Sequence, residues 1–385
     1  MKHCFKALAL AATVAIGSFT QTAVAEVTVG VSLSATGPAA ALGIPGRNTL
    51  ALLPDTIAGE KVRYIFLDDA TDSSQAGRNA RKLIEEDKVD VILGSASTPA
   101  ALAIAEVANE MQTPQVSASP VELPADKNKW VFRTPQHNQI MSDAIVEHMQ
   151  ANGYKSLGFI GYADAYGDSW LGVTKKSLAD TDIELIGVER FNRNDTSVTG
   201  QAVKLVAANP DAILIVASGT PSVLPQVTLQ DRGFKGQIYQ THGTASKDYI
   251  RVGGKAVEGT ILPVGPVIVA DQLPDSHPSK KVGIEYTKLY EDKYGEGSLS
   301  AFGAYFYDAY LLLKAALPQA LENATPGTQA FRDALRDSLE ASTEVVGTHG
   351  VFNMTADDHF GLDDRSRVLV VVEDGDWKLL ESEQE

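Results

Sequence analysis

The chain has 385 residues and a formal net charge of −16 at pH 7, and its one cysteine is Cys4. A protein this acidic repels nucleic acid and anionic lipid surfaces, so we expect neither as a partner. Beyond residue 4 the sequence offers no disulfide, thiol nucleophile or cysteine-ligated metal. Chains longer than about 250–300 residues usually divide into two domains, and we expect two here.

The first 25 residues have the pattern of a cleavable export signal. Lys2 and Lys6 precede the apolar stretch 7–19, and residues 23–25 (Ala-Val-Ala) have the small-x-small form of a signal-peptidase site. The apolar stretch is shorter than the roughly 18 residues that span a bilayer, which argues against a membrane anchor. We therefore expect an exported, soluble protein that begins at Glu26.

From residue 26 to about 265, short β-branched runs alternate with helical patterns, as in α/β proteins with parallel sheets. The strands are predicted at 27–33, 62–67, 89–93, 114–116, 156–160, 183–190, 212–216, 237–240 and 259–263. The helices between them are predicted at 75–86, 99–111, 139–151, 169–179, 198–208 and 222–232. Lys-Leu-Ile precedes the strand at 89 and Lys-Leu-Val precedes the strand at 212. This internal echo indicates two lobes built on the same βα plan.

After residue 266 the pattern changes to longer helices and then returns to strands. The helices are predicted at 278–294, 300–317 and 328–340, and the strands at 350–353, 368–372 and 377–380. Residues 374–376 (Asp-Gly-Asp) predict a hairpin turn between the last two strands. This order indicates that the chain crosses between the lobes more than once.

The sequence contains no nucleophile elbow, phosphate loop, dinucleotide-binding loop or zinc-protease helix motif. We therefore expect no catalytic residue, no metal and no cofactor, and an exported hydrolase is the alternative that these missing motifs argue against. Asp68 and Asp69 follow a strand and invite a metal interpretation. A turn that caps the next helix is the simpler interpretation, because Asp is favoured near a helix N-terminus.

Residues 94–99 (Gly-Ser-Ala-Ser-Thr-Pro) follow a buried strand and end with Pro99 where a helix begins. Either Ser97 or Thr98 caps this helix and does nothing more, or the two hydroxyls and the free backbone N–H groups bind a carboxylate. Ligands of open α/β sheets lie outside the carboxyl ends of the strands, which favours binding. Similar small or hydroxyl-bearing turns follow other strands and would form two walls of a cleft; they lie at 34–38, 117–120 and 161–168.

Together these segments resemble the branched-chain amino acid-binding (Leu/Ile/Val-binding) family of periplasmic proteins that serve ABC importers. The resemblance runs from residue 26 almost to the C-terminus, and it rests on 31–43, 94–119, 132–134, 166–168, 257–259 and 302–308. It implies an α/β, type I periplasmic binding protein with two Rossmann-like lobes, a central cleft and three hinge crossings. The crossings are expected near 133–138, 263–266 and 346–350. The N-terminal lobe would comprise 26–135 plus 266–346, and the C-terminal lobe 136–265 plus 347–385.

The resemblance also implies a set of ligand contacts. By position, Ser97 and Thr98 grip the ligand carboxylate, and Ser119 adds a polar contact from the same lobe. Tyr166 closes from the other lobe and Phe302 forms an aromatic wall, although core packing is an alternative role for both. The first loop and two strand ends of the second lobe complete the set with Thr36, Leu42, Thr220 and His242.

One departure from the family concerns the ligand. Amino acid binders of the family place an acidic residue after the strand that corresponds to 237–240, where it pairs with the ammonium group. Here residues 241–244 read Thr-His-Gly-Thr. A buried ammonium without a countercharge is costly, whereas His242 would donate to an anion. The strand end after Val216, which bears a tyrosine in the family, reads Ala-Ser-Gly-Thr-Pro and leaves room, as in relatives that bind aromatic acids.

We therefore expect a monomeric periplasmic solute-binding protein, with no catalytic activity, that captures a small aromatic or related carboxylic acid. Its partner would be the permease and ATPase complex of an ABC importer in the membrane. Two alternatives stay open: a binder of branched-chain or other hydrophobic amino acids, and a sensor protein that presents its ligand to a receptor.

Overall fold

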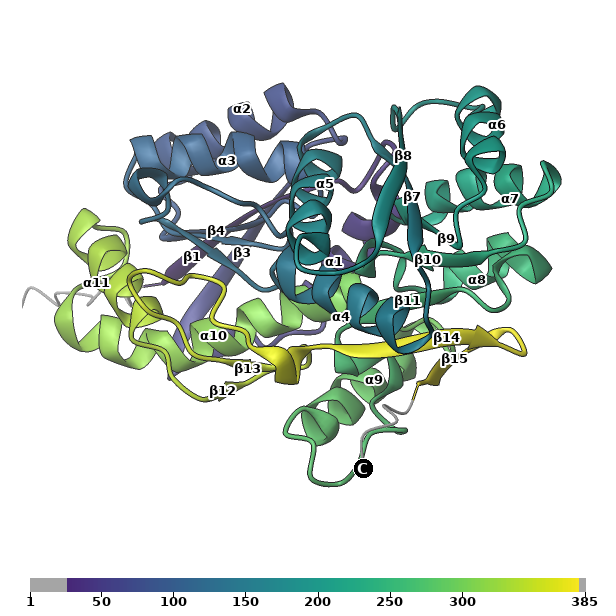
Figure 1. Ribbon diagram of the computed structural model, residues 1–385. Coiled ribbons are helices and arrows are strands. Elements are labelled where there is room, and N and C mark those ends of the chain that lie inside the picture. Colours follow the sequence, from purple (N-terminus) through teal and green to yellow (C-terminus); the bar gives the residue numbers. More distant parts are fainter. Residues whose placement is uncertain (1–25, 381–385) are drawn as a thin grey trace, which may run out of the picture.

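The computed structural model describes residues 26–380, and the export signal expected at residues 1–25 lies outside them. Two sheets form the two lobes (Figure 1). The first sheet has the spatial order β2 (Thr56–Ile57), β3 (Glu60–Asp68), β1 (Val27–Leu33), β4 (Val91–Gly94), β5 (Gln115–Ser117) and β6 (Val131–Arg133). The second has the order β15 (Asp376–Leu379), β14 (Val368–Glu373), β11 (Ile261–Val264), β10 (Gln237–Gln240), β9 (Ala212–Val216), β7 (Ser156–Tyr162) and β8 (Glu184–Phe191). A small hairpin joins β12 (Val345–Val346) to β13 (Val351–Phe352).

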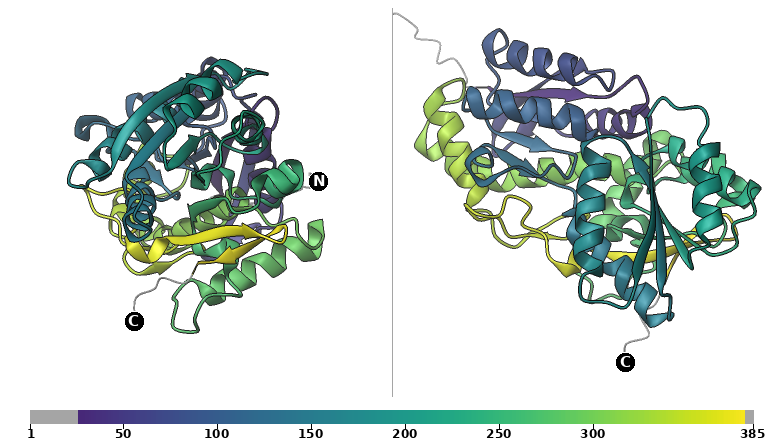
Figure 2. Two further views of the ribbon diagram at one scale, coloured as in Figure 1. Left: turned by 45° about the vertical axis from the view of Figure 1, so that its right-hand side comes forward. Right: turned by 45° about the horizontal axis from the view of Figure 1, so that its top comes forward.

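The helices connect the strands and cover the sheets (Figure 2). They are α1 (Ala40–Leu50), α2 (Ser73–Glu85), α3 (Thr98–Glu110), α4 (Asn138–Ala151), α5 (Ala165–Leu178), α6 (Thr199–Ala208), α7 (Val223–Asp231), α8 (Lys247–Gly253), α9 (Lys280–Tyr294), α10 (Ala301–Asn323) and α11 (Gln329–Glu340). Within residues 26–380, no helix has the length and apolar character needed to cross a membrane.

The two lobes repeat one strand order. The parallel strands run β3-β1-β4-β5-β6 in the first lobe and β8-β7-β9-β10-β11 in the second. The strands of the sequence echo, β4 and β9, both pair with the first strand of their own lobe, through Val29↔Val91 and Leu157↔Ala212. The predicted α/β architecture with two lobes on one βα plan is therefore confirmed, and both sheets have the doubly wound order that places ligands at the carboxyl ends of the strands.

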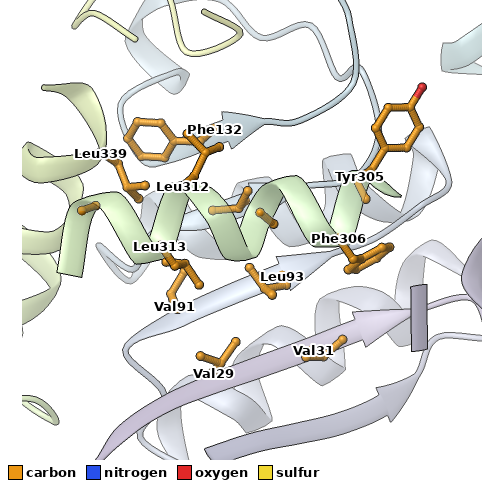
Figure 3. Close-up of a cluster of buried hydrophobic side chains, with 14 of the residues drawn as sticks. Val29, Val31, Val91, Leu93, Phe132, Tyr305, Phe306, Leu312, Leu313 and Leu339 are labelled. Atoms are coloured by element: carbon orange, nitrogen blue, oxygen red, sulfur yellow. The ribbon is translucent and has the colours of Figure 1, made fainter. Parts of the chain in front are cut away.

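The first core lies between the first sheet and α10. All seven residues of β1 are buried, as expected of a strand covered on both faces. Figure 3 shows α10 crossing the strands, with Leu313 beside Val91 and Phe306 near Val31. On the opposite face, α2 and α3 enclose a separate apolar cluster.

The second sheet is enclosed by α4 to α7, and α9 packs where the two lobes meet. Tyr286 and Tyr290 of α9 are buried with residues of β11 and β14. Their hydroxyls also reach α1 of the first lobe, at 2.8 Å from the Thr49 hydroxyl and 3.2 Å from the Asn48 amide. The helix therefore contacts both lobes.

The chain passes between the sheets three times. The first passage, from Arg133 at the end of β6 to the start of α4, lies where the sequence predicts it. The second passage begins after β11 and ends only at α10. Helix α9 still packs with β11 and β14, and α10 is the next element that belongs to the first core. The third lies between Leu362, which packs in the first core, and Val368, which begins β14. It therefore comes later than the predicted 346–350, because the β12–β13 hairpin packs Phe352 against α10 first.

Four helices depart from the predictions, and one of them, α10, runs six residues past its predicted end at 317. Helix α1 was not predicted, because Gly43, Pro45 and Gly46 indicate a loop. Both glycines are packing positions: a Cβ would lie 2.1 Å from the Ser34 carbonyl oxygen at Gly43, and 2.4 Å from the Phe306 ring at Gly46. Helix α8 was not predicted either, and α5 begins at Ala165, four residues before its predicted start.

Candidate functional site

The loops at the carboxyl ends of the strands of both lobes enclose a small cavity of about 30 Å³. This volume is far below the range of about 300–1,000 Å³ that is typical of small-molecule pockets, so the lobes must move apart to admit a ligand. The first lobe contributes Leu42, Ala96, Ser97, Thr98, Ala118, Ser119 and Pro120, with Phe302 and Tyr305 from α10. The first crossing contributes Pro135, and the second lobe contributes Tyr166, Arg193, Ser218, His242 and Gly243.

Seven of the nine predicted ligand contacts line this cavity, and Thr36 and Thr220 do not. Thr36 is exposed, and its hydroxyl donates to the Asp68 carboxylate at 2.7 Å. The neighbouring Asp69 accepts from the Ser34 hydroxyl at 2.6 Å. Asp68 and Asp69 thus tie two loops together, whereas Asp72 caps α2, so the prediction that the Asp68-Asp69 turn caps this helix is wrong. Among residues 26–380, no group of three or more His, Cys, Asp or Glu residues has the arrangement of a metal site.

Ser97 occupies the N-cap position of α3 but makes no side-chain capping bond. Its side chain is buried, with 2% of the residue exposed, and within residues 26–380 its Oγ has no hydrogen-bond partner. An unsatisfied buried hydroxyl costs about 1–3 kcal/mol, so this arrangement favours a ligand atom as the partner. The adjacent helix N-terminus adds free N–H groups and a positive end of the helix dipole.

Two further hydroxyls of the first lobe lie beside Ser97. The Thr98 and Ser119 hydroxyls share a hydrogen bond of 2.7 Å. Ser119 is held in turn by Ser117, whose hydroxyl accepts from the Ser119 backbone N–H at 3.1 Å. The hydroxyl end of the cavity is therefore built on two neighbouring strand ends, β4 and β5.

Tyr166 enters the cavity from the first turn of α5. Its hydroxyl shares a hydrogen bond of 2.8 Å with the Thr241 hydroxyl, and burial raises its pKa well above the ordinary value. The α5 N-terminus is fixed by Asp164, which accepts from the backbone N–H groups of Tyr166 and Gly167. Tyr166 is therefore a neutral, rigid wall of the second lobe.

His242 lines the cavity as predicted, but its charge differs from that of an ordinary histidine, which titrates near pH 6.5. Burial lowers its pKa to about 3, and His349 adds a smaller effect in the same direction. The imidazole is 3% exposed, and within residues 26–380 its Nδ1 has no hydrogen-bond partner. At neutral pH it therefore offers a neutral N–H and an acceptor rather than a cation.

Sequence reasoning missed Arg193, which enters the cavity from the loop after β8. Its Nε donates to Asp164 at 2.6 Å and one terminal nitrogen donates to the Ser218 hydroxyl at 3.1 Å. The guanidinium also lies 4.1 Å above the Tyr162 ring. The polar run Asn192-Arg193-Asn194 directly after a strand was the available signal, since β8 ends at the same edge as the other site loops.

The remaining walls are apolar or aromatic, and the lining contains no Asp or Glu among the described residues. Leu42, Phe302 and Tyr305 are each at most 5% exposed. The nearest acid to Arg193, Asp164, already binds the guanidinium and two backbone N–H groups. The cavity therefore combines hydroxyls, one guanidinium and one neutral imidazole with apolar walls.

The sequence profile of the periplasmic binding protein family matches residues 26–376. The Leu/Ile/Val-binding protein homolog 3 of Brucella melitensis is 25% identical over 355 residues, which cover 89% of this chain and 90% of that protein. An extracellular ligand-binding receptor from Rhodopseudomonas palustris, known as a solved structure, is 47% identical with a TM-score of 0.91, covering 92% of this chain and 99% of that one. A solute-binding protein of an R. palustris ABC transporter, solved in complex with benzoate, has the same fold at 21% identity and a TM-score of 0.76, covering 92% and 95%. The chain therefore belongs to the periplasmic binding protein family.

Proposed function

We propose that this protein captures a small carboxylic acid without an ammonium group, aromatic or related, in the cavity between its lobes. It then presents the acid to the permease and ATPase complex of an ABC importer. The observation that carries this proposal is the Ser97 hydroxyl at the N-terminus of α3, which finds no partner among residues 26–380 and faces a cavity that these residues line without an acid.

The first-lobe end of the cavity suits a carboxylate. A carboxylate accepts several hydrogen bonds, and bonds to a charged acceptor contribute about 1.5–3 kcal/mol each. Ser97 supplies a free hydroxyl, and Thr98 lies beside it at the start of a helix whose dipole favours negative charge. The apolar walls around this end suit a hydrocarbon or aromatic body.

An ammonium group finds no countercharge in the cavity. Asp164 is engaged by Arg193, and His242 is neutral with a pKa of about 3. Burying an unpaired cation costs several kcal/mol even after relaxation. The lining therefore favours the acid over the corresponding amino acid.

The second candidate ligand is a branched-chain or other hydrophobic amino acid, which is favoured by the name of the Brucella relative. The benzoate complex among the proteins of similar fold supports the aromatic-acid proposal instead. Within both proposals the protein works by binding rather than catalysis, as a monomer in the periplasm. A sensor that presents the same ligand to a receptor is the remaining alternative, and loss of ligand uptake after deletion of the gene separates import from sensing.

A thermal-shift screen of the purified protein tests the proposed ligand class. At 100 times its dissociation constant, a ligand stabilises the folded state by about 2.7 kcal/mol. We expect benzoates, phenylpropanoates or aliphatic acids to raise the unfolding temperature, and the amino acids to have little effect. Stabilisation by leucine, isoleucine or valine alone would replace the acid by the amino acid as the ligand.

A further inference from the structure

A buried Asp–His pair lies behind the cavity wall. Asp308 of α10 and His349 are both fully buried, and the Asp308 carboxylate lies 3.0 Å from His349 Nδ1. The carboxylate also accepts from the backbone N–H groups of Thr348 (2.6 Å) and His349 (3.0 Å), and from the Thr348 hydroxyl (2.8 Å). Together with His349 Nδ1, these groups make four donors that hold residues 348–349 against α10. The carboxylate also accepts from Nδ1 and thereby orients the imidazole.

The imidazole of His349 stacks on a residue of the ligand cavity. Its ring centroid lies 4.0 Å from that of Tyr305, with an interplanar angle of 23°. Tyr305 lines the cavity and lies one helical turn before Asp308. Tyr305 and Phe306 leave α10 toward different sides, so the Tyr305 ring points away from Phe306 (Figure 3). His349 therefore helps to fix the orientation of the Tyr305 ring, together with Gln136, which accepts from the Tyr305 hydroxyl at 3.4 Å.

His349 also touches the crossing segments between the lobes. A Cβ on Gly265, at the second crossing, would lie 2.2 Å from the Cδ2 atom of His349. Gln136, in the first crossing, donates from Nε2 to the Ser366 carbonyl at 2.7 Å and to the His349 carbonyl at 3.4 Å. Ser366 belongs to the third crossing, so Gln136 joins the first crossing to the third and to the His349 backbone, while the His349 ring packs against the second.

We propose that Asp308 and His349 are positioning residues that couple the hinge to the ligand cavity, an inference that rests on the proposed function for the role of the cavity. Asp308 holds His349 to the first lobe, and a rotation of the lobes moves the crossing segments against its ring. The stacked Tyr305 ring follows that displacement. Closure of the lobes and the shape of the cavity wall are thereby linked through a continuous set of packed contacts.

Two variants separate the ring from the hydrogen bond. His349→Phe retains a ring for Tyr305 but removes the Nδ1 donor, and Asp308 keeps its three other donors, which preserves the fold. His349→Asn retains a donor but removes the ring. The matched control is His359→Phe, because His359 is equally buried, stacks on Phe132 at 4.2 Å and 15°, and does not line the cavity.

The first measurement needs no ligand. Cysteines replacing Glu85 on α2 and Lys204 on α6, both exposed, carry spin labels in the exported protein, which has no cysteine after residue 4. Pulsed electron paramagnetic resonance then gives the distribution of distances between the lobes. We expect both His349 variants to broaden this distribution, and His359→Phe to leave it as in the wild type. An unchanged distribution in both His349 variants, or equal broadening in the control, would overturn the proposal.

The second measurement is the affinity for 3-phenylpropanoate as a probe. We expect the His349 variants to lose about tenfold in affinity, and His359→Phe to lose less than about twofold at a similar loss of thermal stability. Equal losses of affinity in all three variants would contradict the proposal, because His349 would then contribute only to the stability of the fold. If the wild type binds neither the probe nor any other acid of the thermal-shift screen, the proposed ligand class fails, while the distance measurement still decides the hinge role.

Discussion

A serine at a helix N-cap ordinarily accepts a hydrogen bond from the helix backbone, and Ser97 does not. Its hydroxyl instead lies buried at a cavity with apolar walls, where nothing among the described residues satisfies it. Because Ser97 makes no capping bond, its substitution should weaken ligand binding without destabilising helix α3. This separates the effect of its substitution on affinity from the effect on folding.

The double substitution Ser97→Ala with Thr98→Val is expected to weaken carboxylate binding by about 100-fold, because two charge-assisted hydrogen bonds of about 1.5–3 kcal/mol each are removed. The unfolding temperature should fall only modestly, because the lost Thr98–Ser119 hydrogen bond contributes about 1 kcal/mol and Ser97 makes no capping bond. The control is Thr220→Val, which removes a strand-end hydroxyl outside the cavity. Calorimetric titration checks both proteins, and a loss below about threefold in the double variant would leave these residues as a helix terminus only.

The low pKa of His242 predicts that the folded state loses stability in acid. Its pKa is about 3 in the folded state and about 6.5 in the unfolded chain, so between these values the unfolded state binds the extra proton. Stability is therefore lost as the pH falls below 6.5, by about 1.4 kcal/mol per pH unit from this group alone. His242→Gln should flatten that part of the stability curve in urea titrations between pH 6.5 and 4.5. An identical pH slope in the variant would contradict the neutral, buried assignment.

At the residue scale, the positions of most site residues could be predicted from the sequence, but their hydrogen bonding and charge could not. Ser97, Ser119 and Tyr166 were predicted because they follow strands at the carboxyl edge of a sheet. The unsatisfied state of Ser97 was not predictable, because it depends on the local backbone geometry. Arg193 was missed because the polar run in which it lies resembles an ordinary surface loop, and Asp164, its partner, is distant in sequence.

One hydrogen bond joins helix α5 to the opposite lobe outside the cavity. The Ser169 hydroxyl donates to the Glu122 carboxylate at 2.7 Å and accepts from the Asn138 amide at 2.7 Å. Glu122 follows β5 in the first lobe, whereas Ser169 and Asn138 belong to the second. This bond exists only when the lobes are in contact, so it contributes to closure without touching the ligand.

Ser169→Ala should therefore increase the dissociation rate of the ligand by about two- to fivefold, in line with about 0.5–1 kcal/mol for a partly exposed hydrogen bond, with an unchanged association rate. Ser177→Ala is the matched control, because Ser177 lies on the same helix and bonds only within the second lobe. Stopped-flow displacement gives both rates. Equal dissociation rates in wild type and Ser169→Ala would show that the bond does not contribute to closure.

Among the elements, the repeated βα units were predictable because their strands are continuous apolar runs and their helices are amphipathic. Helix α1 was not, because its glycines serve close packing against Ser34 and Phe306 rather than a turn. The third crossing was predicted too early in the chain, because its position also depends on packing between segments that are distant in sequence. The β12–β13 hairpin is held to the first lobe by Phe352 in a core whose other members come from distant parts of the chain.

The whole molecule presents two lobes in contact around one cavity, with loop 217–220 of the second lobe against α1 of the first. A Cβ on Gly219 would lie 3.1 Å from a Leu42 methyl carbon. Ligand binding by such a molecule requires opening at the crossings. Small-angle scattering should give a larger radius of gyration without ligand than with a saturating carboxylate. Superimposable curves under both conditions would argue against hinge closure.

Calorimetric titration of matched pairs tests the central claim, that the cavity binds a carboxylate without an ammonium group. The pairs are 4-methylpentanoate with leucine and 3-phenylpropanoate with phenylalanine, which differ only in the amino group. Since an unpaired buried ammonium costs several kcal/mol, we predict that the acid of at least one pair binds at least about tenfold more tightly than its amino acid. Tighter binding of leucine or phenylalanine than of the corresponding acid would contradict the account.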